Sequence, residues 1–517
     1  MVTPTAASAP AATPYPRRWQ GLAVLGLSLL IIGIDNTILN VALPTLVREL
    51  GASGAQLQWM VDSYVLVFAG LLLSAGALGD RFGRKGALTS GLVLFGASSL
   101  LASRTNSPEQ LIAVRALMGI GGAFIMPATL SIMTNMFPPE ERARAIGVWA
   151  GFAGVGIPIG PVAGGFLLEH YHWSAIFLVN VPVVVIAIAA GAVLLPTSRD
   201  PNSPRVDIPG AVLSFAGVST LVWGLIEAPA RGWTSVTTLG AFGLAATLLA
   251  AFALVETRIR QPMLDMRFFR NPRFTAANAA ITLVFFAMFG SMFGMTQYLQ
   301  FVLGYSPLSA GVRMLPMAAG IMVAAPASAR LVEHAGTKVV VAFGLATVAV
   351  ALLLLSRIES GTGYGWFVSC MIVMAIGMGL TMAPSTEAVM GSIPRSRAGV
   401  GSAMNDTTRQ VGGALGVAVL GSLISSVYRS RMEDAITGLP PAAARAAHDS
   451  LGAALQVAAR SGPAGEQLAD VARQSFLHAM ALGLRAGAAV AILGAVVAVL
   501  FLPAHGEDAG LDFEESE

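Results

Sequence analysis

The sequence predicts an all-α integral membrane protein with fourteen transmembrane helices. Of its 517 residues, 55% are hydrophobic and only 11% are charged, and the mean hydropathy is +0.71. A soluble chain of this length needs more charged residues to cover its surface. Apolar runs of about 20 residues recur instead, and this length matches a hydrocarbon core about 30 Å thick.

Composition and motifs also exclude several functional classes. The net charge of +3 is small and the basic residues are spread over many loops, which argues against a nucleic-acid partner. The single cysteine, Cys370, lies within an apolar run, so neither an intrachain disulfide nor a cysteine metal site is expected. The sequence has no P-loop, Gly-x-Ser-x-Gly or His-Glu-x-x-His motif. We therefore expect no enzymatic activity, no cofactor and no metal.

The chain begins with a polar segment followed by a first apolar run. Residues 1–18 are rich in Pro, Ala, Ser and Thr, so we expect a disordered cytoplasmic N-terminus. The run that follows Arg17 and Arg18 is too long for a signal peptide and contains Asp35, which predicts an uncleaved first helix. The expected helices are 20–43, 58–79, 86–103, 108–135, 143–168, 174–195, 207–228, 236–255, 274–303, 309–333, 338–356, 365–391, 399–427 and 480–502.

The distribution of Lys and Arg predicts the orientation of the chain. With a cytoplasmic N-terminus, 17 of these residues lie in cytoplasmic segments and 9 in outer segments, as the positive-inside rule requires. The acidic tail 503–517 is then cytoplasmic as well. We expect a multi-pass protein of the cell membrane with both termini inside.

An internal repeat predicts two lobes. The segment Arg330–Lys338 repeats the leucine, acid, glycine and lysine of Leu78, Asp80, Gly83 and Lys85 at the same spacing. We expect a six-helix N-terminal lobe at 19–195, two inserted helices with a cytoplasmic linker at 196–273, and a six-helix C-terminal lobe at 274–502. Residues 428–479 form a long outer segment, either a helical lid or a mobile loop.

The segment that joins the second and third expected helices is Gly76-Ala-Leu-Gly-Asp80-Arg81-Phe-Gly83-Arg84-Lys85-Gly86-Ala-Leu88. Four glycines and four charges fall within these thirteen residues. The segment resembles the signature loop of the major facilitator superfamily and matches it at every defining position. This resemblance implies a solute transporter with two lobes around a central site.

Three further segments resemble motifs of the same family. Leu111-Ile-Ala-Val-Arg115-Ala-Leu-Met-Gly119 is similar to the arginine motif of the fourth helix, although Met118 replaces the usual glutamine. Gly156-Ile-Pro158-Ile-Gly160-Pro161-Val-Ala-Gly164-Gly165 is similar to the fifth-helix motif of antiporters. Ile34-Asp35-Asn36-Thr37-Ile-Leu-Asn40-Val-Ala-Leu-Pro44 resembles the first helix of the 14-helix drug:proton antiporters. The resemblance covers nearly all of residues 18–502.

The resemblance to this branch implies a proton-coupled antiporter that exports lipophilic, cationic drugs or antibiotics by alternating access. It implies a small-molecule substrate, protons and the lipid bilayer as partners, the proton gradient as the energy source, and a monomer. Two alternatives stay open. One is an exporter of an amino acid or native metabolite, and the other is a membrane sensor or scaffold that does not transport.

Asp35 and Arg115 are the expected proton-coupling residues. A charged side chain at the bilayer centre costs at least ~3 kcal/mol and therefore faces a cavity or a partner. Counted along their helices, both residues lie in the outer half of the N-terminal lobe and can approach one another. Burial favours the neutral form of a carboxyl group and a nearby arginine favours its anion, so Asp35 can carry a proton and Arg115 can tune it. The alternative is a fixed structural ion pair.

Asp62 is a candidate for a cationic substrate or a second proton. Gln58 precedes it by one turn on the same helix face, and Asn36 adjoins Asp35; we assign both to the same site. The alternative for Asp62 is an acid wetted by the outer vestibule.

Asp406 on the thirteenth helix is a further candidate for the substrate or a second proton. Arg409 follows it at i+3, so the alternative is a pair within the helix. Glu387 is expected to reach the cytoplasmic interface. Phe289 and Gln297 are candidate substrate contacts on the ninth helix, where the alternative is lipid exposure or ordinary packing.

The signature loop is the expected cytoplasmic gate. Asp80 is placed to cap a neighbouring helix N-terminus or to pair with an arginine, and Gly83 permits the turn without a Cβ penalty. The basic residues are expected to hold anionic lipid or helix C-termini, and Arg330–Lys338 is a second, weaker latch. The alternative is a merely positive hairpin. The gate residues are Gly76, Asp80, Arg81, Gly83, Arg84 and Lys85.

Glycines of the fifth helix recur at i+4 and present a smooth strip for close helix contact. Two prolines weaken the local hydrogen-bond ladder and permit bending. Such a strip lets two helices seal and slide, as a rocking antiporter requires; the alternative is ordinary tight packing. The expected residues of this antiporter helix are Gly156, Pro158, Gly160, Pro161, Gly164 and Gly165.

Overall fold

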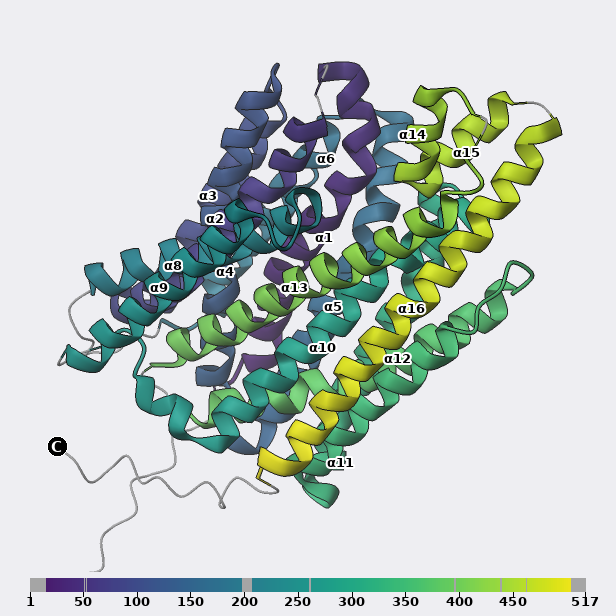
Figure 1. Cartoon of the computed structure of the whole chain (residues 1–517). Coiled ribbons are helices and arrows are strands. Elements are labelled where there is room, and N and C mark those ends of the chain that lie inside the picture. Colours follow the sequence, from purple (N-terminus) through teal and green to yellow (C-terminus); the bar gives the residue numbers. More distant parts are fainter. Residues whose placement is uncertain are drawn as a thin grey trace, which may run out of the picture.

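A computed structural model describes residues 15–50, 52, 54–197, 207–259, 262–394, 397–437, 439–461 and 463–503. Most of the expected N-terminal segment and tail lie outside these residues. The described part forms a bundle of long helices without a strand (Figure 1). Its helices are α1 Arg18–Leu50, α2 Gly54–Phe82, α3 Arg84–Ala102, α4 Pro108–Met136, α5 Pro139–His170, α6 Ala175–Leu178, α7 Asn180–Leu194, α8 Ile208–Arg231, α9 Val236–Arg258, η1 Met266–Arg270, α10 Pro272–Gln297, η2 Tyr298–Val302, α11 Pro307–Leu355, α12 Tyr364–Gly391, α13 Ala398–Met432, α14 Pro441–Asp449, α15 Leu451–Arg460 and α16 Pro463–Phe501.

The number of membrane crossings agrees with the fourteen that the sequence predicts. Within the described residues, 13 helical segments are long and apolar enough to cross a membrane, and one of them, Leu308–Leu355, has 48 residues. This segment contains two of the expected spans, which meet at Gly336. The backbone of Gly336 is not helical, with φ 79° and ψ 157°. Because only glycine adopts such a positive φ without a steric penalty, this residue separates the two crossings.

Several helices extend well beyond the apolar runs that predict them. α1 reaches Leu50 rather than residue 43, and α16 begins at Pro463 rather than at residue 480. A helix satisfies its own backbone hydrogen bonds in water as well as in lipid, so it does not have to end where hydrophobicity ends. Apolar runs therefore locate the spans but underestimate the helix lengths.

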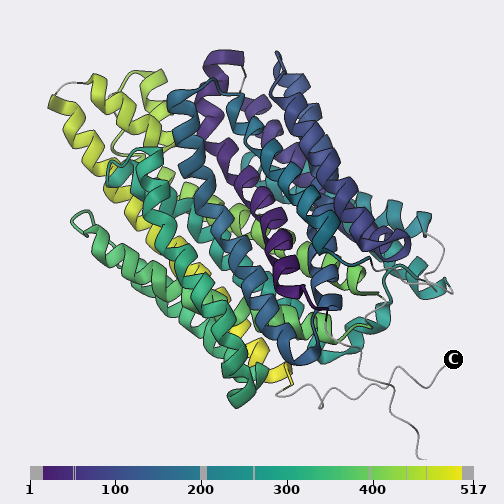
Figure 2. The ribbon, with the colours of Figure 1, turned by 180° about the vertical axis from the view of Figure 1, so that it is seen from behind.

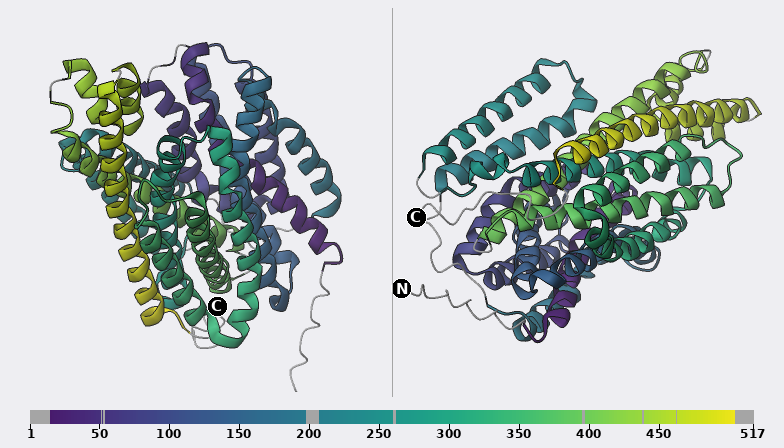
Figure 3. Two further views of the ribbon diagram at one scale, coloured as in Figure 1. Left: turned by 90° about the vertical axis from the view of Figure 1, so that its right-hand side faces the viewer. Right: turned by 90° about the horizontal axis from the view of Figure 1, so that it is seen from below.

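The helices form two groups with a hairpin beside them. Helices α1–α7, here called the N-terminal lobe, pack mainly on one another, as do α10–α16, the C-terminal lobe. The hairpin of α8 and α9 packs on α2 and α13 and lies at the edge of the bundle (Figure 3). The lobes meet where α5 contacts α11 and where α2 contacts α13.

The long outer segment is helical, which favours the lid over the mobile loop. α14 and α15 lie beside the first turns of α16 at one end of the bundle (Figure 1). The Tyr428 hydroxyl donates a hydrogen bond to the Ala447 carbonyl at 3.1 Å, and Leu451 and Ala454 are buried. These contacts fix the segment on the C-terminal lobe.

Candidate functional site

Asp35 and Arg115 meet inside the N-terminal lobe. The Arg115 Nη1 donates to the Asp35 Oδ2 at 2.5 Å, and both residues are at most 1% exposed. The Arg115 Nε also donates to the Met60 carbonyl at 3.0 Å. The structure therefore brings together the two residues that the sequence singles out, across α1 and α4.

Two further residues, Tyr64 and Asn180, contact this pair. The Arg115 guanidinium lies 4.5 Å from the ring centroid of Tyr64, within the range of a cation–π interaction. Asn180 Nδ2 lies 3.5 Å from Asp35 Oδ1 and also donates to Ser99 Oγ at 3.0 Å. Sequence reasoning missed both residues, although Asn180 is an isolated polar residue within an apolar run, which was a usable signal. The geometry gives Asp35 one strong cationic partner and one neutral donor.

Close helix packing allows the approach of α2 and α4 around this pair. A Cβ at Gly119 would lie 2.7 Å from the Tyr64 carbonyl, and one at Gly122 would lie 2.9 Å from the Tyr64 hydroxyl. Such distances are too short for a real side chain, so α4 presents bare backbone to α2. This contact holds Tyr64 against Arg115.

The candidates Asn36 and Asp62 lie near the pair in the chain, Asn36 next to Asp35 and Asp62 two residues after Met60, whose carbonyl accepts from Arg115. Asp62 and Asn36 are both half-buried, and each has an interaction partner. The side chain of Gln58 lies outside the described residues, so the expected pairing with Asp62 stays a prediction.

Asp80 joins the two lobes through the signature loop. Its carboxylate accepts hydrogen bonds from the backbone N–H of Gly399 at 3.0 and 2.8 Å and from that of Val400 at 3.2 Å. These groups begin α13, where unpaired N–H groups and the helix dipole favour an anion. Arg84 Nε donates to Asp80 Oδ1 at 2.7 Å. Both expected roles of Asp80, the cap and the arginine pair, are therefore present together.

The other gate residues support this contact. Gly83 has φ 112°, which permits the turn between α2 and α3. A Cβ at Gly76 would lie 2.8 Å from the Ala403 Cβ of α13. Lys85 Nζ donates to the Ala192 and Leu195 carbonyls at 2.8 and 2.9 Å, as expected for a cation at the C-terminus of α7. Arg81 lies in the last turn of α2, as expected for a cation at a helix C-terminus, and its guanidinium is 5.3 Å from the ring centroid of Phe82.

The repeat in the C-terminal lobe shares the turn of the signature loop but not its buried acid. Gly336 has a positive φ like its counterpart Gly83. Glu333, however, is exposed, whereas Asp80 is 5% exposed. An acid on the bundle surface does not cap a helix of the other lobe, so the expected second latch is not formed in this state.

The glycine strip of α5 faces α1. A Cβ at Gly156 would lie 2.8 Å from the Gly33 Cα, and one at Gly160 would lie 2.8 Å from the Ile34 carbonyl. A Cβ at Gly164 would lie 2.8 Å from a side-chain carbon of Ile38. α1 and α5 therefore touch backbone to backbone.

The opposite side of α5 faces α11 of the other lobe (Figure 2). A Cβ at Gly165 would lie 3.0 Å from the Leu308 Cβ, and one at Gly311 would lie 2.8 Å from the Pro161 Cβ. The side chain of Pro158 lies outside the described part of the chain. The predicted motif thus places α5 between its own lobe and the facing one.

A family model of the Major Facilitator Superfamily matches residues 25–417. The chain belongs to this superfamily. It is 37% identical to the "Multidrug efflux pump LfrA" of Mycolicibacterium smegmatis over 95% of this chain and 98% of that protein. It is 33% identical to the "Tetracenomycin C resistance and export protein" of Streptomyces glaucescens over 97% of this chain and 95% of that protein.

Solved structures support the same fold. The crystal structure of the human organic anion transporter MFSD10 (TETRAN) has a TM-score of 0.60 and 13% sequence identity. It covers 93% of this chain and 100% of that chain. At this identity the likeness concerns the fold alone, which is that of a major facilitator.

A second acid and arginine lie in the C-terminal lobe of this major facilitator. Asp406 and Arg409 are 1% and 4% exposed, but Arg409 Nη1 is 3.9 Å from Asp406 Oδ1, too far for a hydrogen bond. Arg409 Nη2 donates instead to Thr386 Oγ1 at 2.9 Å. Asn405 Nδ2 lies 3.3 Å from Asp406 Oδ1. The expected ion pair within the helix is therefore present, but without a hydrogen bond between its two side chains.

Glu387 is paired rather than simply extended toward the interface. Its Oε2 accepts from Arg273 Nη2 at 3.2 Å, and its side chain is 25% exposed. Arg273 lies at the first turn of α10. This ion pair joins the first turn of α10 to the last turns of α12.

The two candidate substrate contacts of α10, Phe289 and Gln297, lie on different turns of this helix. Phe289 is half-buried and stacks on Phe285 with ring centroids 5.9 Å apart. Gln297 is half-buried in the last turn of α10, eight residues beyond Phe289 along the same helix. The structure supports Phe285, which is 8% exposed, as the better-placed aromatic residue.

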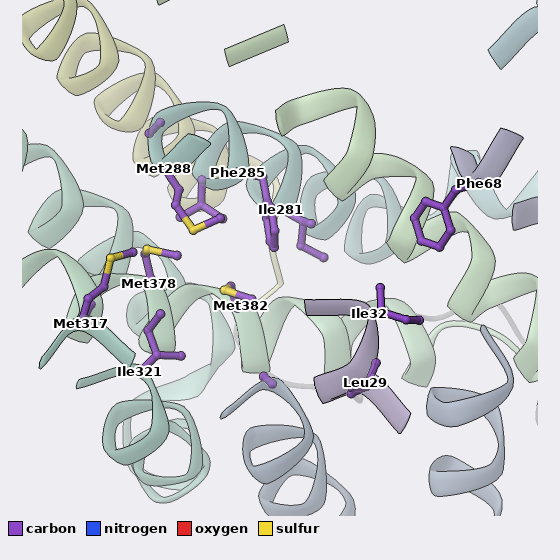
Figure 4. Close-up of a cluster of buried hydrophobic side chains, with 14 of the residues drawn as sticks. Leu29, Ile32, Phe68, Ile281, Phe285, Met288, Met317, Ile321, Met378 and Met382 are labelled. Atoms are coloured by element: carbon purple, nitrogen blue, oxygen red, sulfur yellow. The ribbon is translucent and has the colours of Figure 1, made fainter. Parts of the chain in front are cut away.

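Phe285 belongs to a cluster of buried apolar side chains that come from both lobes. Figure 4 shows side chains of α10, α11 and α12 on one side of this cluster and side chains of α1 and α2 on the other. Methionine is flexible and polarizable, so it adapts to ligands of different shape. The labelled members are Leu29, Ile32, Phe68, Ile281, Phe285, Met288, Met317, Ile321, Met378 and Met382.

Proposed function

We propose that this chain is a proton-coupled antiporter that exports lipophilic, cationic drugs or antibiotics across the cell membrane by alternating access. The buried pair of Asp35 and Arg115 carries the proposal. A carboxylate at this depth needs a compensating charge, and protonation removes the need for it. A proton that binds Asp35 therefore releases Arg115, and this changes the contacts between α1 and α4.

The names of similar proteins support drug export as the transported function. Both relatives are named for efflux or export, one of several drugs and one of tetracenomycin C. The methionine-rich cluster between the lobes provides apolar surface that suits lipophilic compounds of several shapes. Buried carboxylates in both lobes favour cationic substrates over anionic ones.

The contact between Asp80 and Gly399 supports alternating access. It joins α2 and α13 on the side that the Lys and Arg distribution assigns to the cytoplasm. We infer that this structure is closed toward the cytoplasm and that export requires the contact to break once in each cycle. The protein works as a monomer with both termini inside, and the proton gradient replaces any cofactor.

The pH difference and the membrane potential set the free energy that one proton supplies for transport. A proton that enters the cell releases ~1.4 kcal/mol per pH unit and ~2.3 kcal/mol per 100 mV of membrane potential. Exchange of one proton for one monovalent cation is electroneutral, so only the pH term remains. Efficient export of a cation therefore benefits from a second proton, for which Asp62 and Asp406 are the candidates.

Uptake of tetraphenylphosphonium into proteoliposomes tests the proposal. With the cytoplasmic side outward and an acidic interior, we expect the wild type to accumulate this lipophilic cation as the proton gradient dissipates. Asp35→Asn should abolish accumulation driven by pH and retain exchange of labelled for unlabelled cation. Equal accumulation in both proteins would contradict coupling through Asp35. No movement of the cation in either protein would favour a metabolite exporter or a sensor.

A further inference from the structure

The guanidinium of Arg409 lies between two aromatic rings. Its Cζ is 4.8 Å from the ring centroid of Trp149 and 5.4 Å from that of Phe285. These distances are within about 6 Å, the range in which an aromatic face attracts a cation. Trp149 is 0% exposed, so the interaction is shielded from water.

The two rings belong to opposite lobes. Trp149 lies on α5 of the N-terminal lobe, where its Nε1 donates to Thr129 Oγ1 of α4 at 3.2 Å. This hydrogen bond fixes the direction of the indole plane. Phe285 lies on α10 of the C-terminal lobe, beside Met288 and Ile281 in Figure 4. The position between the rings therefore exists only while the two lobes face each other.

This position lies well inside two membrane-spanning helices. Trp149 is ten residues beyond the first residue of α5 and Arg409 is eleven beyond the first residue of α13, which places both about 15 Å along their helices. A hydrocarbon core is about 30 Å thick, so both side chains lie away from the ends of their spans. Transporters bind their substrates within the membrane, between their repeats.

The polar groups beside the rings are incompletely satisfied. Among the described residues, Asp406 Oδ2 and Arg409 Nε have no hydrogen-bond partner, and Arg409 Nη1 lies 3.9 Å from Asp406 Oδ1. Asp35 and Arg115, in contrast, are hydrogen-bonded at 2.5 Å. Arg409 is thus held chiefly by the rings and by Thr386, and Asp406 retains a free acceptor oxygen in a buried site.

We propose that Trp149, Phe285 and Asp406 form the binding site for the cationic group of the substrate, and that Arg409 is a tethered cation that occupies this site between transport events. The proposal deepens the proposed function, on which it rests. An incoming cation displaces the guanidinium from the rings and uses the free oxygen of Asp406. When the cation leaves, Arg409 returns, so Asp406 always has a positive neighbour.

The geometry defines the class of substrate. Two ring faces and one carboxylate favour a weakly hydrated, delocalised positive charge over a small ammonium ion. The methionines and isoleucine near Phe285 favour an apolar body next to that charge. The expected ligand is therefore a lipophilic monovalent organic cation, and a neutral molecule of the same shape gains nothing from the rings.

Equilibrium binding to the purified full chain, without any proton gradient, tests this site. The probes are tetraphenylphosphonium and the neutral triphenylphosphine oxide. We expect Trp149→Leu to weaken binding of the cation about tenfold and to change binding of the neutral probe less than about twofold. Trp149→Phe, which keeps a ring, should lie between the wild type and Trp149→Leu and should fold if the leucine variant does not.

Variants of Arg409 test the tethered cation. Arg409→Met keeps a long apolar side chain without the competing charge, so we expect it to bind tetraphenylphosphonium severalfold more tightly. Arg409→Lys should bind close to the wild type. The double variant Arg409→Met with Asp406→Asn removes both charges, and its cation binding should still weaken when Trp149 becomes Leu.

Two results would overturn the inference. One is that the Trp149 variants change the affinity for the cationic and the neutral probe by the same factor, whether both affinities fall or neither does. Such a result would mean that Trp149 contributes only packing. The other is weaker cation binding by Arg409→Met, because a competitor cannot strengthen the binding that it opposes. Failure of pH-driven uptake with these binding results intact would contradict the proposed function and leave the site in place.

Discussion

Asp80 of the N-terminal lobe accepts hydrogen bonds from the backbone N–H of Gly399, the second residue of α13 in the C-terminal lobe, at 3.0 and 2.8 Å. The two residues are 319 positions apart in the chain. A carboxylate at a helix N-terminus is stabilised both by the N–H groups and by the helix dipole. This contact holds the lobes together on one side of the membrane and must open if the lobes alternate.

Removal of the charge of Asp80 should open that side. Asp80→Asn loses the charge-assisted part of these hydrogen bonds. In a Cys370→Ala background with Ala403→Cys at the interface with α2, we expect maleimide to label the cysteine several times faster in the Asp80→Asn variant. Asp434→Asn changes an exposed acid of the outer segment and should leave the rate unchanged. Equal rates in all three proteins would show that the contact does not control access.

The orientation of the chain can be tested with the same cysteine-free background. Ser461→Cys lies between α15 and α16, and Arg267→Cys lies in η1; both positions are exposed. In intact cells, a membrane-impermeant maleimide should label the first position and not the second. The positive-inside count predicts this result, and the reverse pattern would invert the assignment of every loop.

The glycine strip predicts a stability cost for added side chains. Gly156→Ala places a Cβ 2.8 Å from the Gly33 Cα, so we expect it to destabilise the protein by about 1–3 kcal/mol and to slow transport. Gly243→Ala on α9 meets no atom within 4 Å and should be neutral. Thermal unfolding and initial transport rates measure the two effects. A destabilised Gly156→Ala protein with a normal rate would assign the strip to packing alone.

The pair of Asp35 and Arg115 predicts a non-additive double-mutant cycle. Arg115→Met leaves a buried carboxylate without its cation, and we expect a loss of about 3–5 kcal/mol. Asp35→Asn in the same chain should restore much of this stability, because it removes the charge that was left unpaired. Thermal unfolding of the four proteins measures the coupling. Additive losses would mean that the two groups do not depend on each other.

The spans, the signature loop and the Asp35–Arg115 pair can be predicted because each has a recognisable local pattern in the sequence. An apolar run, a charged hairpin and an ionisable residue inside a span are visible without knowledge of the partner. Asp80 belongs to this group, since its position next to a turn indicates a cap. The local sequence around its partner Gly399, however, does not distinguish this residue from the other glycines.

Features that depend on how helices rotate and meet are not visible in the same way. Trp149 and Phe285 look like ordinary apolar residues of two spans, and only tertiary packing brings both to Arg409. The helical state of the segment after Tyr428 is also set by packing on α16 rather than by a long apolar run. The exposure of Glu333 shows that a repeated motif does not ensure a repeated contact.

The release of protons on addition of substrate tests proton coupling through Asp35 most directly. Proteoliposomes carry a pH dye inside, with the membrane potential clamped at zero, and tetraphenylphosphonium is added on the cytoplasmic side. Coupling through Asp35 predicts that the wild type releases protons from the lumen in fixed proportion to the cation taken up, and that Asp35→Asn releases none while it still exchanges the cation. Proton release by Asp35→Asn equal to that of the wild type would contradict coupling through Asp35.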